Sequence, residues 1–201
     1  MASPFVKKQD VMDAREELVR YYRLLREHGL NDSHSGNASV RDGDVIWVTP
    51  TGCCADTVVR DDLIRCHIDG SIGDGASLDA RLHVMVYQKN ATARAMLHSH
   101  GAHTVALTLN GEDFIPADFE GRYYFPRVPV IDAPYSDYVS RSPELVSNVL
   151  RDHRVTVYRG HGVYAQGQSL NLAYKWTSSL ELAAKTFWLA KLAGTLPEQD
   201  K

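Results

Sequence analysis

The sequence predicts an α/β (α+β) fold: a single domain over residues 1–201, with a central, mostly antiparallel β-sheet flanked by α-helices. The 201 residues suit one compact domain or two small ones, and neither a linker nor an internal repeat divides them. With 44% hydrophobic residues, the chain can bury a sizeable core. Stretches with helical periodicity lie at both ends and in the middle, and hairpin-connected apolar runs lie between them.

The first half of the chain predicts two helices and four strands. The first helix ends before Gly29, which follows a run of apolar side chains at helical spacing. Asp42-Gly43 separates two short apolar runs and is a strong signal for a hairpin turn. The expected elements are a helix at residues 11–28, strands at 38–41, 44–48 and 61–68, a helix at 78–90 and a strand at 93–100.

The second half of the chain predicts three further strands and a long final helix. Ser169 is placed as the N-cap of that helix, because its hydroxyl can accept a hydrogen bond from the first turn. Gly160 and Gly162 mark a turn between two strands. The expected elements are helices at residues 102–110, 143–152 and 169–193, and strands at 128–133, 155–158 and 163–166.

Charge and cysteine content argue against several classes of protein. The formal net charge is −3 and no run of like charges stands out, which argues against nucleic-acid binding. No apolar stretch is long enough to cross a bilayer, and residues 1–10 lack the apolar core of a signal peptide. The odd number of cysteines (Cys53, Cys54 and Cys66) does not resemble a disulfide framework. We therefore expect a protein of the reducing cytoplasm, with neither nucleic acid nor membrane as a partner.

Three histidines are the strongest candidates for chemistry. His98 and His100 end an apolar run, and alternate residues of a strand point to the same face, so the two imidazoles can aim at one point. Taken alone, such a pair is more often a solvated strand end. His161 lies between two glycines, where the backbone can turn sharply to present a side chain. Three neutral imidazoles that leave an open position on a cation are typical of catalytic zinc sites.

Five motifs in a fixed order extend this pattern over nearly the whole chain. Each is a weak signal by itself, but in this order and at these spacings the sequence resembles the class II aldolase/adducin family. The motifs are Ser35-Gly36-Asn37-Ala38-Ser39, Thr49-Pro50-Thr51-Gly52, Ser77-Leu78-Asp79 with His83, His98-Ser99-His100, and His161-Gly162. The resemblance implies the class II aldolase/adducin fold and a homotetramer with active sites between subunits.

The resemblance also implies what the site binds. One divalent metal ion per subunit, most often zinc, with Mn²⁺, Co²⁺ or Fe²⁺ as alternatives, would be held by His98, His100 and His161. The expected substrate is a small-molecule sugar phosphate or a related anion. The family's phosphate-binding loops correspond here to Gly36, Asn37, Thr51, Gly52 and Ser77. By composition alone these segments are ordinary turns. Many relatives have a second serine where this chain has Leu78, which leaves a carboxylate-bearing substrate open.

Candidate acid–base groups are Asp79, Glu120 and Tyr124. Asp79 holds the position at which the family's aldolases have a glutamate base and its 4-epimerases an aspartate. The alternative is a carboxylate favoured by the dipole of a helix N-terminus. Glu120 falls where a neighbouring subunit's tyrosine protonates the leaving aldehyde, and Tyr124 falls near the epimerase's catalytic aspartate. The aromatic segment around them equally suits core or interface packing.

The resemblance implies a metal-dependent lyase that cleaves a C–C bond of a ketose by retro-aldol chemistry through a metal-stabilised enediolate, an aldehyde-lyase. A decarboxylase of a keto or hydroxy-aromatic acid (a carboxy-lyase) is the first alternative, since the same stabilisation serves that reaction. A sugar-phosphate 4-epimerase or dehydratase of the same superfamily also stays open. An adducin-like structural module is the alternative without enzymatic activity, and the three histidines argue against it.

Overall fold

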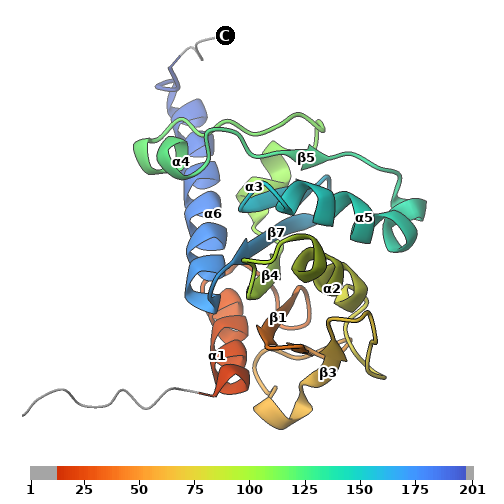
Figure 1. The fold of residues 1–201 in the computed structure, drawn as a ribbon. Helices are drawn as coiled ribbons and strands as arrows, with labels where there is room; N and C mark the ends of the chain where they lie inside the picture. The colour runs from red at the N-terminus through yellow and green to blue at the C-terminus, as the bar shows by residue number, and fades with distance from the viewer. Residues whose placement is uncertain (1–12, 198–201) are drawn as a thin grey trace, which may run out of the picture.

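The computed structural model describes residues 13–197, and a single seven-stranded sheet lies at its centre (Figure 1). The spatial order of the strands is β3-β2-β1-β4-β7-β6-β5. All neighbouring strands are antiparallel except β5 and β6, which are parallel, so the predicted mostly antiparallel sheet is confirmed. The strands are β1 (Asn37–Asp42), β2 (Val45–Val48), β3 (Ile64–His67), β4 (Ala95–Ser99), β5 (Val130–Ile131), β6 (Val155–Tyr158) and β7 (Gly162–Gly167).

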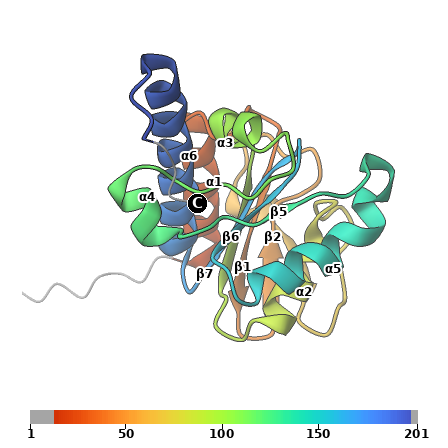
Figure 2. The same ribbon diagram turned by 90° about the horizontal axis from the view of Figure 1, so that it is seen from above.

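Helices cover both faces of this sheet (Figure 2). On one face α1 and α6 pack against β1, β4 and β7, with α3 beside α6; on the other face α2 and α5 pack together. The helices are α1 (Ala14–Glu27), α2 (Ala80–Lys89), α3 (Ala102–Leu107), α4 (Phe119–Tyr124), α5 (Tyr138–Leu150) and α6 (Leu170–Ala193), with 3-10 turns at Arg60–Asp62 and Tyr135–Asp137. The predicted architecture of helices flanking a central sheet is therefore present.

Strand β4 is the centre of the core because both of its faces are covered. Ala95 and Leu97 pack into the cluster under α1 and α6, whereas Met96 packs into the cluster under α2 and α5. Every residue of the strand is buried, as is expected of a strand with helices on both sides. The histidines that follow Leu97 thus emerge from a strand that is held on both sides.

Turn and cap signals in the sequence mark the observed boundaries well. The Asp42-Gly43 hairpin joins β1 and β2, with Asp42 paired to Val45 and Gly43 at φ +61°. Ser169 caps α6, accepting a hydrogen bond from the amide of Leu172 at 3.2 Å. Helix α1 begins after Asp13, so the expected start at residue 11 lies outside the described residues.

Two expectations about the second half were wrong. The helix expected at residues 143–152 begins five residues earlier, at Tyr138, and contains Pro143 in its interior. Proline favours the first turn of a helix, which made Pro143 a misleading start signal; in the interior of α5 it removes the hydrogen bond to the carbonyl four residues back. The aromatic segment, for which neither a helix nor a strand was expected, contains a short helix, α4, whose N-cap Asp118 accepts a hydrogen bond from the amide of Gly121.

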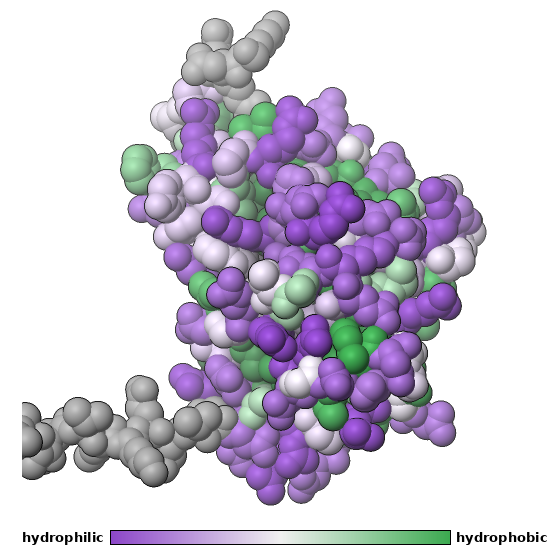
Figure 3. Space-filling model, viewed as in Figure 1, coloured by the Kyte–Doolittle hydropathy of each residue, from purple (hydrophilic) through white to green (hydrophobic). Residues whose placement is uncertain are grey.

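The surface seen in Figure 3 is mostly hydrophilic, with apolar groups in small separate patches. Large apolar side chains are exposed on α4 and on the second half of α6, including Phe119 and Leu192. Within residues 13–197, no helix combines the length and the apolar character needed to cross a membrane.

Candidate metal centre

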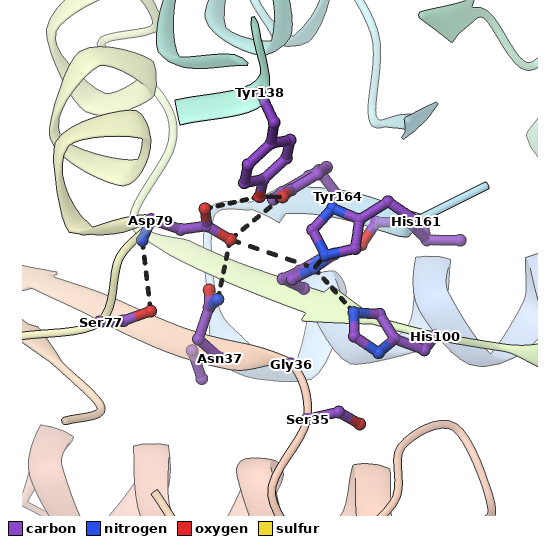
Figure 4. Close-up of polar contacts among 12 residues, drawn as sticks. Ser35, Gly36, Asn37, Ser77, Asp79, His100, Tyr138, His161 and Tyr164 are labelled. Atoms are coloured by element: carbon purple, nitrogen blue, oxygen red, sulfur yellow. Dashed lines mark hydrogen bonds and ion pairs between the residues drawn. The ribbon is translucent and has the colours of Figure 1, made fainter. Parts of the chain in front are cut away.

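Three imidazoles converge at one end of the sheet (Figure 4). His98 is the fourth residue of β4 and His100 follows its last residue, while His161 lies in the turn between β6 and β7. Since β7 runs antiparallel beside β4, that turn and the end of β4 meet at the same edge. The Nε2 atom of His98 lies 3.0 Å from that of His100 and 3.3 Å from that of His161. The structure thus brings together the three predicted metal ligands; metal binding itself stays a prediction.

The arrangement of the three rings fits a transition-metal ion. Nδ1 of His98 lies 2.9 Å from the carbonyl oxygen of Val163, so Nδ1 carries the proton and donates it, leaving the lone pair of Nε2 directed at the other two rings. A hydrogen-bonded outer nitrogen of this kind orients metal-binding histidines in general. A donor set of three imidazoles suits zinc and its neighbours rather than calcium or magnesium, which prefer oxygen.

Burial keeps all three imidazoles neutral. It lowers the pKa of His98 well below the ordinary value and that of His100 to about 4, and the nearby imidazole of His161 adds to both shifts. Burial likewise lowers the pKa of His161, against the opposing charge of Asp79. At neutral pH the rings are therefore in the deprotonated state that a metal ion requires.

Two glycines make the position of His161 possible. Gly160 has φ +68°, a conformation that side chains other than glycine's rarely adopt. A Cβ at Gly162 would lie 2.3 Å from the carbonyl oxygen of Ser99 and 2.6 Å from Cδ2 of His100. The first glycine permits the turn and the second permits the close approach of β7 to the end of β4.

Opposite the imidazoles lies a buried carboxylate, Asp79, which is 5% exposed. It occupies the N-cap position of α2 but makes no capping bond. Its Oδ1 accepts a hydrogen bond from Tyr138 Oη at 2.6 Å, and its Oδ2 accepts bonds from Asn37 Nδ2 at 2.9 Å and Tyr164 Oη at 3.0 Å (Figure 4). Oδ2 also lies 4.0 Å from Nε2 of His98. The geometry favours a site residue over a simple helix-end charge.

The donors around Asp79 decide its protonation. Burial alone would raise the pKa of this carboxyl, but the hydrogen bonds from Tyr138 and Asn37 oppose burial, and the net effect is a lowered pKa. Burial and the charge of Asp79 raise the pKa of Tyr138 and Tyr164. Asp79 is therefore an anion held by protonated phenols, whose hydroxyl groups also contact each other. The ring of Tyr164 stacks on His98, with centroids 4.0 Å apart.

The predicted anion-binding loops open onto the same space as the triad and Asp79. A cavity of about 200 Å³ is lined by all five predicted loop residues, the three histidines, Asp79, Leu78 and Tyr138. A wider cavity of about 870 Å³ adjoins it and shares Leu78, Tyr138 and His161. Ser77 Oγ accepts a bond from the amide of Asp79 at 3.3 Å, which leaves its own proton available. One cavity thus combines the five predicted loop residues, three imidazoles and a carboxylate.

The structure does not bring Glu120 and Tyr124 to this cavity within one chain. Both lie on α4, which packs against α6. Glu120 is exposed, whereas Tyr124 packs edge-on against Trp176 and lies 4.3 Å from the Lys175 ammonium. These contacts match the packing alternative for Tyr124. The roles predicted for both residues concern a neighbouring subunit and stay predictions.

Sequence reasoning missed three residues that shape the site: Tyr138, Tyr164 and Asn31. Tyr138 follows a helix start that Pro143 obscured. Tyr164 faces His98 across the β4–β7 pair, so strand register was the signal that could have found it. Asn31 contacts the backbone at both His98 and His100.

Comparison with known proteins gives consistent results. The family described as Class II Aldolase and Adducin N-terminal domain matches residues 16–188. The L-fuculose phosphate aldolase of Methanocaldococcus jannaschii is 26% identical over 172 residues, which cover 85% of this chain and 93% of the relative. The 3-oxo-tetronate 4-phosphate decarboxylase of Haemophilus influenzae is 30% identical over 189 residues, covering 87% and 86%. The crystal structure of L-fuculose-1-phosphate aldolase from Thermus thermophilus superposes with a TM-score of 0.83 at 29% identity, covering 94% of this chain and 100% of that one.

Proposed function

Because the chain belongs to the class II aldolase and adducin family, whose matched members are named as aldolases, a decarboxylase and epimerases, we propose that it is a divalent-metal-dependent lyase. The reaction we propose is retro-aldol cleavage of a C–C bond in a ketose, with a sugar phosphate as the leading substrate class. The observation that carries this proposal is one cavity that combines three neutral imidazoles, an ionised carboxylate and an oxyanion cradle.

The histidines and Asp79 have separate roles in the proposed reaction. His98, His100 and His161 hold the cation, and zinc fits this donor set best, with Mn²⁺, Co²⁺ and Fe²⁺ as alternatives. When bound, such a cation supplies a Lewis acid that polarises a carbonyl and stabilises the negative charge that develops as the bond breaks. Asp79 is ionised beside the triad; it accepts the hydroxyl proton of the carbon that becomes the aldehyde as the C–C bond breaks, and returns that proton to the carbon of the other fragment that keeps the bonding electrons.

The substrate's anionic end binds at the loops. Gly36, Asn37, Thr51, Gly52 and Ser77 provide backbone amides and hydroxyl or amide donors at the cavity wall. The adjoining wider cavity gives room for the part of the substrate beyond the broken bond. The group that contacts the aldehyde end of the substrate comes from a neighbouring subunit of a homotetramer, where Glu120 and Tyr124 are the candidates. The exposed apolar side chains of α4 and α6 offer contact surface for that neighbour.

A decarboxylase acting on a keto or hydroxy-aromatic acid is the second candidate. A relative with 30% identity is named as a 3-oxo-tetronate 4-phosphate decarboxylase, and this chain has Leu78 where many relatives have a serine donor. Loss of carbon dioxide also leaves negative charge beside the carbonyl, so the same residues suit either reaction.

A product assay separates the two candidates. Purified protein loaded with one equivalent of zinc is incubated with a panel of ketose 1-phosphates and of phosphorylated 3-oxo acids. Aldolase activity releases an aldehyde and a three-carbon phosphate without carbon dioxide, and a chelator abolishes it. Carbon dioxide from the oxo acids alone would establish the decarboxylase. A protein that carries no stoichiometric metal and turns over neither panel would instead support the adducin-like structural module.

A further inference from the structure

A buried asparagine outside the cavity holds the backbone that carries two of the three imidazoles. Asn31 lies in the loop after α1 and is 7% exposed. Its Nδ2 donates to the carbonyl oxygen of His98 at 3.3 Å, and its Oδ1 accepts from the amide of His100 at 2.9 Å. These two backbone groups flank Ser99 and face the same edge of the strand, because residues two apart share an orientation. The side-chain amide of Asn31 therefore hydrogen-bonds to the backbone of both predicted metal ligands, His98 and His100.

The backbone of β4 needs a hydrogen-bonding partner beyond His98, where its pairing with β1 ends. Strand β1 pairs with β4 only as far as the opposite residues Asn37 and His98. Beyond that pair the chain turns away at Gly36, so the backbone of His100 has no residue of β1 beside it. The carbonyl of Leu30 and the Oδ1 of Asn31 share the amide of His100 instead. Buried peptide groups without partners are costly, and Leu30 and Asn31 together take the place of the missing strand.

The same asparagine touches the anion-binding loop. A Cβ on Gly36 would lie 2.2 Å from Nδ2 of Asn31 and 2.4 Å from the carbonyl oxygen of His98. Gly36 also has φ +70°, so both space and backbone conformation require glycine there. The next residue, Asn37, lines the cavity and donates to Asp79. Asn31 thus lies in contact with the strand that carries the imidazoles and with the loop that begins the oxyanion cradle.

We propose that Asn31 is a positioning residue that sets His98 and His100 relative to each other and to the Gly36–Asn37 loop. It acts through the backbone, since its side-chain amide bonds to main-chain atoms and does not line the cavity. This inference rests on the proposed metal-binding function. Residues that orient metal ligands without binding the metal themselves typically contribute 10–100-fold to metal affinity. We expect metal affinity to fall by about this factor when the amide of Asn31 is removed.

The test compares Asn31→Asp with a matched variant, Asn90→Asp. Aspartate keeps the shape and the acceptor for His100, but replaces the donor to His98 with an oxygen that repels that carbonyl. Asn90 is a second buried asparagine that bridges backbone groups, donating to Leu150 O at 3.1 Å and accepting from Thr92 N at 3.0 Å, at a distance from the triad. Both variants lose one amide donor in the core, so both are expected to lower the melting temperature of the metal-free protein.

Zinc affinity is measured on metal-free protein by competition with a chromophoric chelator, and ligand geometry by the visible spectrum of the Co²⁺-loaded protein. Asn31→Asp is expected to weaken zinc binding roughly 10–100-fold and to change the cobalt spectrum. Asn90→Asp is expected to bind zinc as tightly as the unmodified chain and to leave the spectrum unchanged. Asn31→Ser, which removes the amide without adding a charge, gives the same readout if the aspartate variant fails to fold.

Two results would overturn the proposal while leaving the metal centre in place. One is unchanged zinc affinity and cobalt spectrum in a folded Asn31 variant. The other is an equal loss of affinity in Asn90→Asp, which would assign the effect to general destabilisation. Failure of the unmodified chain to bind zinc would overturn the proposed function and this inference together. This outcome differs from the two above because it is seen in the unmodified chain, without any substitution.

Discussion

The two walls of the cavity are built in different ways. The imidazole wall comes from two adjacent strands: His98 and His100 are two residues apart at the end of β4, and His161 precedes β7. The carboxylate wall brings four distant segments together, since Asp79 at α2 meets side chains from β1, α5 and β7. A short-range spacing rule predicts the His98–His100 pair of the first wall, and one strand pairing adds His161. The second wall depends throughout on sheet register and helix packing.

The walls also differ in charge. Burial keeps the imidazoles neutral, with lone pairs that can bind a cation, while the hydrogen-bond donors around Asp79 stabilise its carboxylate anion. We therefore assign metal binding to the imidazole wall and proton transfer to the carboxylate wall. Substitutions on the two walls should have different signatures, and the following predictions use that difference.

The largest effect is expected from His98→Ala. Loss of the most buried of the three clustered imidazoles should abolish stoichiometric zinc binding and reduce turnover by about 10³-fold or more, because the Lewis acid is lost with it. Metal analysis after dialysis and an aldehyde-release assay check both. His153→Ala removes an exposed imidazole and should change neither. Full zinc content in His98→Ala would show that the imidazole wall is not the metal site.

Asp79→Asn should lower turnover by roughly 10²–10⁴-fold, the usual contribution of a positioned acid–base group, with zinc still bound. The amide has the size of the carboxylate but cannot accept a proton. Parallel assays of kcat and zinc content test this. Loss of the metal along with activity would contradict the assignment of separate roles to the two walls, because Asp79 would then contribute to metal binding.

Tyr138→Phe should reduce kcat about tenfold, since it removes one hydrogen bond to a charged group. The phenol donates to the ionised carboxylate and so lowers the pKa of Asp79. Its removal raises that pKa, and the acid limb of the kcat–pH profile should move to higher pH. Tyr21→Phe is the matched control, because it removes a hydroxyl bonded to Asn171 far from the cavity. A profile that stays in place, or moves to lower pH, would separate Tyr138 from proton handling.

Leu78→Ser should have the smallest effect. The leucine is 64% exposed at the mouth of the cavity, so fold stability should change by less than about 0.5 kcal/mol. A hydroxyl there adds one donor near the loops, and a net hydrogen bond of about 1 kcal/mol lowers KM for a phosphorylated substrate roughly fivefold. Leu78→Ala separates the gained hydroxyl from the lost apolar surface. A KM that falls equally in both variants would assign the gain to lost bulk.

The parts of this molecule that followed from sequence are those set by neighbours along the chain. The Asp42-Gly43 turn, the Ser169 cap and the alternation that aims His98 and His100 to one side depend on local backbone geometry. The expected loop residues also line the cavity as a group.

The parts that did not follow depend on packing between distant elements. Tyr138 reaches Asp79 only because α5 begins before Pro143 and lies against α2. In the sequence, Asn31 looks like an ordinary polar loop residue. Its contact with His98 exists only because the fold places β4 beside this loop. The roles of Glu120 and Tyr124 depend on a second subunit, which no local pattern places.

X-ray absorption at the zinc edge of the unmodified, zinc-loaded protein tests the central claim most directly. We predict one zinc per chain with three imidazole nitrogens at about 2.0–2.1 Å and an oxygen atom as the fourth ligand. Sulfur ligands from the cysteines, fewer than three imidazoles, or no stoichiometric zinc would contradict it.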